Sequence, residues 1–238
     1  METPPAGPVI DRRRPELAPY RVPERPSVGN RWSASAWIFV RRGGTSQLAA
    51  GGLLGGSQAG ARVSYRLNRD SARPLALSGR VYAPLGSLEA SEAAFGVSWK
   101  PVAGLPVEVL AERRQALGPD GRSAFSLIAY GGVSERPVLG PVQLDAYAQG
   151  GVVGLKSRDF FADGSALLTA PLVPSGRVKA GLGVWGAAQP GLSRLDIGPH
   201  VSARLSPVRA RLTAEWRLRV AGSAKPASGP ALTLSADF

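Results

Sequence analysis

Residues 208–220, VRARLTAEWRLRV, alternate strictly between polar and apolar side chains. The polar positions are Arg209, Arg211, Thr213, Glu215, Arg217 and Arg219, and every position between them is apolar. Because successive side chains of a β-strand point to opposite faces, this pattern predicts a strand with one charged and one apolar face. Either a soluble sheet has one solvated face, or a barrel has a polar inside and an apolar outside.

The same alternation recurs in about twelve short segments between residue 31 and the C-terminus. The clearest segments besides 208–220 are 59–67, 142–152 and 193–205. The other eight are 31–42, 74–84, 91–100, 106–116, 122–132, 161–170, 176–189 and 230–238. Short connections with turn residues separate them, which predicts an antiparallel meander, since parallel neighbours need crossovers of about a dozen residues or more. The one long connection, 42–60, either contains a short strand or is a loop.

The first 29 residues differ from the rest, because they hold seven prolines and the basic run Arg12, Arg13 and Arg14. Proline at this density favours extended polyproline II and cannot join a central sheet ladder. Residues 1–29 are therefore predicted to be a disordered, basic linker or tail, followed by a barrel domain at 30–238; the alternative is a basic plug that enters a lumen.

Residues 1–29 lack the apolar core of a signal peptide. For an exported protein we therefore expect a start further upstream or a longer precursor.

The charged positions favour a closed barrel over a soluble sandwich. The apolar positions are rich in alanine and glycine, whereas sandwich cores favour large side chains that interlock. Opposite charges recur at the polar positions of many segments, as expected where Arg and Glu of neighbouring strands pair inside a lumen. We predict an all-β, antiparallel, up-and-down transmembrane β-barrel of about 12 strands. Its predicted lumen-lining residues are Arg62, Arg66, Arg80, Glu108, Glu112, Arg114, Asp145, Arg204, Arg209, Arg211, Glu215, Arg217 and Arg219.

The apolar positions are expected to face lipid. The chain ends LTLSADF, which resembles the C-terminal signal that the barrel assembly machinery of bacterial outer membranes reads. An even strand count places both termini in the periplasm, where Phe238, Trp99 and Tyr65 would share an aromatic girdle. Arg113 breaks the apolar pattern, and a position at the membrane interface would let its side chain snorkel. The residues predicted to face lipid or to form the assembly signal are Trp99, Leu212, Trp216, Leu232, Leu234 and Phe238.

The formal net charge of +12 raises a different possibility, a soluble basic all-β module that binds nucleic acid or acidic polysaccharide. In the barrel interpretation, the arginines of 209–219 line a closed lumen and no series of spaced aromatic residues accompanies them, so no nucleic-acid partner is expected. The absence of cysteine and the single histidine argue against thiolate or zinc sites, and no cofactor is expected. The glycine-rich GGLLGGSQAG lacks the Lys-Ser/Thr of a phosphate loop.

His200, Ser202 and Glu215 are the candidates for catalysis, because they share the polar side of adjacent segments. They would supply a base, a nucleophile and an orienting acid, and the His-x-Ser spacing resembles that of barrel lipid A deacylases. However, residues i and i+2 of a strand lie about 7 Å apart at Cα. A deacylase must also present its site to lipid, whereas these positions are predicted to be luminal. We expect a protein that is not an enzyme.

The segment AAFGVSWKPVAGLPVEVLAERRQALGPDGRSAFSLIAYGG, residues 93–132, contains SWKP, a strand ending in AERR, and a strand with YGG. It resembles the C-terminal barrel domain of the NfrA-type bacteriophage adsorption protein family, and LDIGPHVSARL and the terminal strand are similar to later parts of that domain. The resemblance covers about residues 31–238. It implies an outer-membrane, porin-like barrel of a Gram-negative bacterium.

The resemblance also implies a link to surface exopolysaccharide and a role as a phage receptor. The expected function is that of a structural or passage component, with exopolysaccharide or its export proteins as partners. Members of the family carry a periplasmic helical-repeat region before the barrel. Here only the Pro-rich segment precedes the barrel, so we expect a barrel-only relative or a fragment.

Leu212→Arg tests which face of the strand 208–220 meets lipid. If Leu212 faces lipid near the bilayer midplane, the change is expected to lower the free energy of unfolding by about 2 to 4 kcal/mol. Urea unfolding of the protein in lipid vesicles measures this difference. Full tolerance of the arginine would favour the soluble module.

Overall fold

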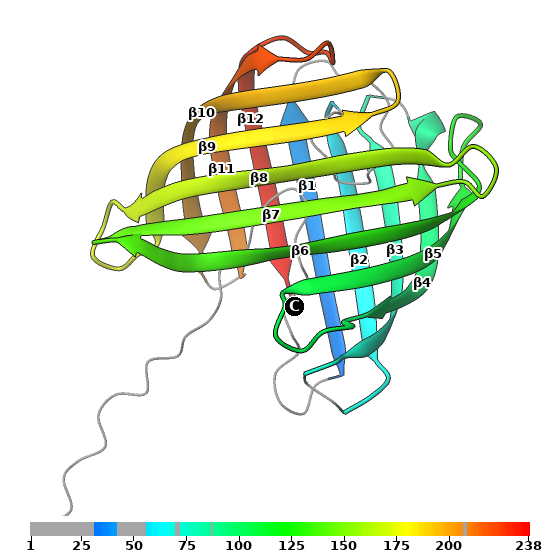
Figure 1. Ribbon diagram of the computed structural model, residues 1–238. Helices are drawn as coiled ribbons and strands as arrows, with labels where there is room; N and C mark the ends of the chain where they lie inside the picture. The colour runs from blue at the N-terminus through cyan, green and yellow to red at the C-terminus, as the bar shows by residue number, and fades with distance from the viewer. Residues whose placement is uncertain (1–30, 42–55, 70–71, 87, 207–208) are drawn as a thin grey trace, which may run out of the picture.

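The computed structural model describes residues 31–41, 56–69, 72–86, 88–206 and 209–238. The described strands form one closed antiparallel barrel (Figure 1). They are β1 (Trp32–Arg41), β2 (Gln58–Arg66), β3 (Leu75–Pro84), β4 (Glu92–Trp99), β5 (Val107–Ala116), β6 (Ala124–Leu139), β7 (Val142–Val153), β8 (Asp159–Pro171), β9 (Val178–Gln189), β10 (Leu192–Leu205), β11 (Ala210–Ala221) and β12 (Gly229–Asp237).

Each strand pairs with the next one in the chain, and the last strand returns to the first. The closing seam joins β1 to β12, from Ser35 opposite Asp237 to Arg41 opposite Ala231. The predictions of an antiparallel meander and of about 12 strands are confirmed. Figure 1 shows β6 to β10 crossing in front of β1, β2, β11 and β12 at a steep angle, as expected of strands that are tilted in a closed barrel.

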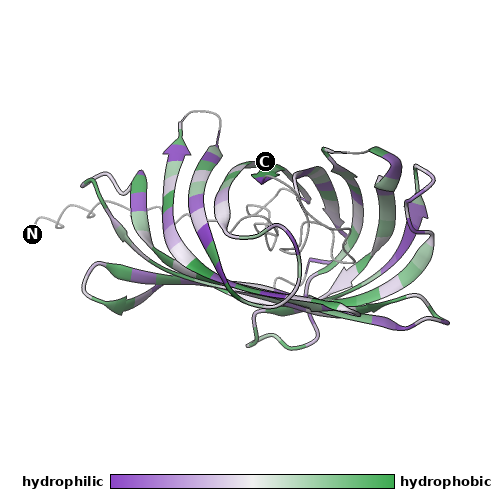
Figure 2. Cartoon of the chain, turned by 90° about the horizontal axis from the view of Figure 1, so that it is seen from above, coloured by the Kyte–Doolittle hydropathy of each residue, from purple (hydrophilic) through white to green (hydrophobic). Residues whose placement is uncertain are grey.

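The polar and apolar positions of each strand separate between the inside and the outside of the barrel. In β11, Arg211, Thr213, Glu215 and Arg217 are buried, and the apolar residues between them are exposed. Figure 2 shows the same alternation of hydrophilic and hydrophobic bands along the strands around the barrel. The barrel therefore has its apolar surface on the outside.

The boundaries differ from the sequence predictions mainly at β6. The segment 122–132 was expected to end at Gly132, but β6 continues to Leu139 and forms a long hairpin with β7. The register shifts between Val133 and Arg136, and Glu135 has a φ of 47°. These bulges interrupt the two-residue alternation, which is why the pattern gave no signal for the extension. In the long connection, residues 58–60 belong to β2; residues 42–55 and the predicted linker 1–29 lie outside the described residues.

The connections fall on two rims of the barrel. The terminal rim, next to the start of β1 and the end of β12, holds the turns from β2 to β3, β4 to β5, β6 to β7, β8 to β9 and β10 to β11. The opposite rim holds the end of β1 and the start of β2, and the chain turns there between β3 and β4, with a short 3-10 helix at Leu88–Ala90, and at 117–123, 154–158, 190–191 and 222–228. No helix in the described part of the chain is long and apolar enough to cross a membrane.

Candidate functional site

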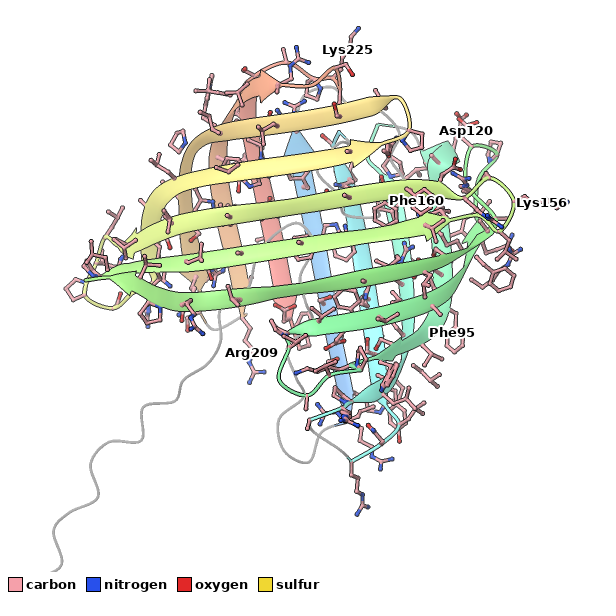
Figure 3. The ribbon with its side chains drawn as sticks, viewed as in Figure 1. Phe95, Asp120, Lys156, Phe160, Arg209 and Lys225 are labelled. Atoms are coloured by element: carbon pink, nitrogen blue, oxygen red, sulfur yellow. The ribbon has the colours of Figure 1, made fainter. Side chains whose placement is uncertain are left out.

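The barrel interior holds most of the residues that were predicted to line a lumen. Eight of them are buried, namely Arg62, Arg80, Glu112, Arg114, Asp145, Arg211, Glu215 and Arg217. Arg66, Glu108 and Arg219 are half-buried at inward positions nearer the rims. Arg204 lies at the terminal rim with 41% of its side chain exposed. Arg209 is exposed in the turn before β11, with a φ of 48°, and points away from the barrel in Figure 3.

Two neighbouring ion pairs fix the wall from β3 to β6. Arg80 of β3 reaches past β4 and donates from Nε and Nη2 to both oxygens of Glu112, at 3.0 and 2.5 Å. The Ser126 hydroxyl donates to the same carboxylate at 3.0 Å. Arg114 donates to Glu92 at 3.0 Å, and the other oxygen of Glu92 accepts from the backbone N–H of Arg122. Both carboxylates thus have partners on each oxygen, as buried charges require.

A second buried group lies on the wall formed by β9, β10, β11 and β1. Arg217 donates from Nε to Glu215 Oε2 at 2.7 Å, and His200 Nδ1 lies 3.1 Å from Glu215 Oε1. The Arg217 guanidinium carbon lies 5.2 Å from the ring centre of Phe39 and 4.7 Å from that of Trp185. Cation–π contacts of this kind are stronger where water is absent. Arg217 is therefore held by a carboxylate and two aromatic rings from three different strands.

Asp196 connects this wall to the opposite rim. Its Oδ2 accepts from Arg194 at 2.6 Å and from Arg41 at 3.2 Å. The two guanidinium groups also donate to carbonyl oxygens of the β11–β12 connection: Arg194 to Ala224 at 3.1 Å, and Arg41 to Ala227 at 3.3 Å. Ala224 is fully buried in the hydrophobic cluster that contains Trp185. These contacts fold the connection against the barrel interior.

The extended β6–β7 hairpin forms a separate cluster at the terminal rim. Glu135 pairs with Lys179 of β9 and accepts from Arg204 of β10 at 2.6 Å. The Asp145 carboxylate accepts from the backbone N–H of Glu135 at 2.9 Å. The bulge thus directs one acidic side chain toward two strands that are not its neighbours.

Several interior residues were missed by the sequence analysis. Arg194 shares its side of β10 with Asp196, so the alternation itself could have identified it, and the same holds for Arg41 at the end of β1. Trp37, Phe39 and Trp185 gave no such signal, because they are apolar residues at inward positions. Space for the two tryptophan rings comes from Gly60 and Gly183, where a Cβ atom would collide with the ring of Trp37 or of Trp185.

The outer face is apolar along the regular stretches of the described strands. All six residues that were predicted to face lipid or to form the assembly signal are exposed: Trp99, Leu212, Trp216, Leu232, Leu234 and Phe238. Leu212 is the third residue of β11, close to the terminal rim and not near the midplane. The expected cost of Leu212→Arg therefore falls to about 0 to 1 kcal/mol. Arg113 is the only charged side chain at an outward position on these regular stretches. Its guanidinium carbon lies 5.0 Å from the ring centre of Phe125.

Outward aromatic side chains gather toward the two rims. Near the terminal rim, the rings of Trp32 and Tyr65 lie 4.8 Å apart between their centres. This group comprises Trp32, Tyr65, Trp99 and Phe238, and the group toward the opposite rim comprises Phe95, Phe125, Phe160 and Trp216. Aromatic girdles in this arrangement are typical of barrels that span a membrane.

The candidate catalytic residues do not form a triad. His200 and Glu215 are opposite each other in the register of β10 and β11 and are in contact. Among the described residues, no hydrogen bond joins Ser202 to His200, and Ser202 lies opposite Thr213. Both side chains are buried inside the barrel. In the described part of the chain, no group of three His, Asp or Glu side chains has the arrangement of a metal site.

No family model and no curated protein matches the chain. One similar solved structure is described as "Unveiling the Mechanism Behind the in-meso Crystallization of Membrane Proteins", with 8% identity, 87% of this chain and 83% of that chain covered, and a TM-score of 0.49. Another is in-vitro folded OmpT, an outer membrane protein of Vibrio cholerae in its trimer form, with 9% identity, 87% and 97% covered, and a TM-score of 0.34. Neither similarity is strong enough to identify a family or a function.

Glu112→Ala tests whether the interior ion pairs hold the wall together. The change leaves Arg80 buried without its carboxylate, so we expect the free energy of unfolding to fall by about 3 to 5 kcal/mol. Urea unfolding in lipid vesicles gives the difference. The exposed Asp120→Ala, with an expected change within about 0.5 kcal/mol, is the control. Equal effects of the two variants would contradict a structural role of the pair.

Proposed function

We propose that this chain is an integral outer-membrane β-barrel with a non-enzymatic role, as a structural or passage component linked to surface exopolysaccharide export. The observation that carries the proposal is that the barrel exposes apolar side chains on its outside and buries charged side chains inside, the reverse of a soluble protein. Large apolar side chains such as Leu212 and Trp216 are 43% and 51% exposed, while Arg217 and Asp196 are fully buried. A soluble protein rarely exposes a contiguous apolar patch of more than a few hundred Å², whereas lipid provides the solvent that such a surface needs.

The closed sheet supports a membrane location independently. In the hydrocarbon region, a backbone N–H or C=O without a partner costs several kcal/mol, and only helices and closed barrels avoid this cost. Here β1 and β12 pair along seven residue positions, so no edge is left. The two aromatic groups provide side chains suited to both interfaces.

The soluble basic module is a weaker interpretation of the same residues. Binding to phosphates needs accessible cations, but Arg211 and Arg217 are buried inside the barrel. A nucleic acid on the outer face would meet alanine, leucine and valine instead of a basic stripe. The positive charge of Arg211 and Arg217 is therefore better suited to the interior.

The geometry of His200 supports a non-enzymatic role. Its Nδ1 contacts Glu215, which is at the same time the partner of Arg217. Among the described residues no hydrogen bond joins Ser202 to this histidine, and the wall of the barrel separates both from the lipid side. A lipid substrate would have to enter the interior to reach them.

The ion pairs favour a structural role, because Arg80–Glu112 and Arg41–Asp196 connect strands that are not neighbours. A passage role is favoured by the charge balance of the interior. The described residues include nine buried Arg and Lys and seven buried Asp and Glu, and such an excess would prefer anionic solutes such as acidic saccharides. The resemblance to the NfrA-type family supports the link to exopolysaccharide and a further role as a phage receptor.

Membrane fractionation with heated and unheated gel samples tests the location. We expect recovery in the outer-membrane fraction, and faster migration of the unheated barrel because the closed sheet stays folded in detergent. A protein that stays soluble without detergent would overturn the proposal and favour the basic module.

Planar-bilayer recording separates the passage role from the structural role. Passage predicts a conductance above background that prefers anions over cations, and replacing Arg211 with Gln should reduce this preference. An outward Leu212→Val variant is the control and should leave the selectivity unchanged. Conductance at background level would leave only the structural role.

A further inference from the structure

Arg113 occupies a position that the rest of the outer face reserves for apolar side chains. It lies opposite Phe95 on β4 and opposite Phe125 on β6, so the three outward side chains form one row across neighbouring strands. All three are exposed, Phe95 at 61% and Phe125 at 52%. Girdles of aromatic side chains flank the apolar band of barrels that span a membrane. In the membrane location proposed above, the arginine would lie at such a girdle, where a charge on the lipid face costs little.

The surroundings of Arg113 add positive charge on the same rim. The row continues to β7, since the carbonyl oxygen of Phe125 accepts from the backbone N–H of Gly154 at 2.8 Å. Lys156 and Arg158 follow in the next connection, and both are exposed. Arg122, in the connection between β5 and β6, bonds to Ser157 and Asp159 and so joins this connection to the one between β7 and β8. Figure 3 shows Lys156 and Asp120 at the same corner of the barrel.

This rim faces the outer leaflet if the protein has the location proposed above. The start of β1 and the end of β12 lie at the other rim, and the longest sequence interval between consecutive strands, from Arg41 to Gln58, separates two strand ends at this one. Barrels of bacterial outer membranes have short turns on the periplasmic side and longer loops outside. The outer leaflet of such membranes consists of a glycolipid that carries phosphate groups at the level of the interface.

On this basis, which rests on the proposed function, we propose that Arg113 and the neighbouring Lys156 and Arg158 form a binding site for the phosphate groups of the outer-leaflet glycolipid. A guanidinium group matches a phosphate with two parallel hydrogen bonds. Phe125 holds the guanidinium group against the barrel wall, and Phe95 and Phe125 contact the first methylenes of the acyl chains. The site combines a charged contact for the phosphate with an apolar contact for the chains below it.

The test uses the purified full chain in detergent micelles, with bisphosphorylated lipid A and its dephosphorylated form as probes. Native mass spectrometry counts the bound lipid, and a thermal unfolding scan measures the shift in Tm. We expect lipid A with its phosphates to bind and raise the Tm, and the dephosphorylated form to bind about tenfold more weakly. Arg113→Gln should lose the same factor, and Arg113→Lys should lose less because it keeps the charge.

The matched control is Arg177→Gln, an exposed arginine in the β8–β9 connection of the terminal rim, which should bind lipid A as the unchanged protein does. Heat-modifiable migration of each variant shows that its barrel is folded. A folded outer-membrane barrel that binds both forms of lipid A equally, or whose Arg113→Gln variant binds unchanged, would overturn the phosphate site and leave the proposed function intact. Equal binding of phosphatidylglycerol would also overturn it, since that result shows only a general preference for anionic lipid.

Discussion

The pairing of β12 with β1 is the constraint on which the rest of this structure depends. A sheet of this size with two free edges would leave rows of backbone donors and acceptors without partners. Closure satisfies them along the seam from Ser35–Asp237 to Arg41–Ala231. It also gives every strand one face toward the interior and one face toward the outside. Successive residues of a strand therefore lie alternately in the interior and on the outer surface. The charges of the interior and the alanine and leucine of the exterior are consequences of this single geometric fact.

Enclosing so many charges carries a high cost, and the arrangement of the pairs shows how it is offset. Isolated ions in a medium of low polarity lose several kcal/mol of solvation each, and pairing repays this only where the hydrogen bonds are complete. Both oxygens of Glu112 accept hydrogen bonds, from Arg80 and Ser126, whereas Asp196 accepts from two arginines on Oδ2 and its buried Oδ1 has no hydrogen-bond partner among the described residues. Arg217 bonds a single carboxylate, that of Glu215, and the ring faces of Phe39 and Trp185 provide further favourable contacts with its charge. The interior is thus a network in which few members could be removed alone.

The strand count, the meander and the sides of most strands follow from the sequence because one physical rule, the two-residue alternation, acts at every position. Local exceptions to the rule were not predictable. The bulge around Glu135 inserts residues that belong to neither face, so the extension of β6 left no periodic signal. Arg209 occupies a polar position of the alternation, which predicted that it faces the lumen. It lies in the turn before β11, however, where successive side chains do not point to opposite faces. The ion-pair partners were also not predicted. Arg80 of β3 bonds Glu112 of β5, and the register of neighbouring strands does not show which side chains meet across an intervening strand.

The β6–β7 hairpin gives the barrel a mechanical property that its wall lacks. A tube held only by bonds between adjacent strands can flatten into an ellipse without breaking any of them. Glu135 extends from β6 to Lys179 on β9 and Arg204 on β10, and so acts as a brace across the mouth. Arg41 and Asp196 join β1 and β10 in the same manner near the other rim. Cross-links at both rims resist such flattening, so the cross-section is fixed by side chains as well as by the number of strands.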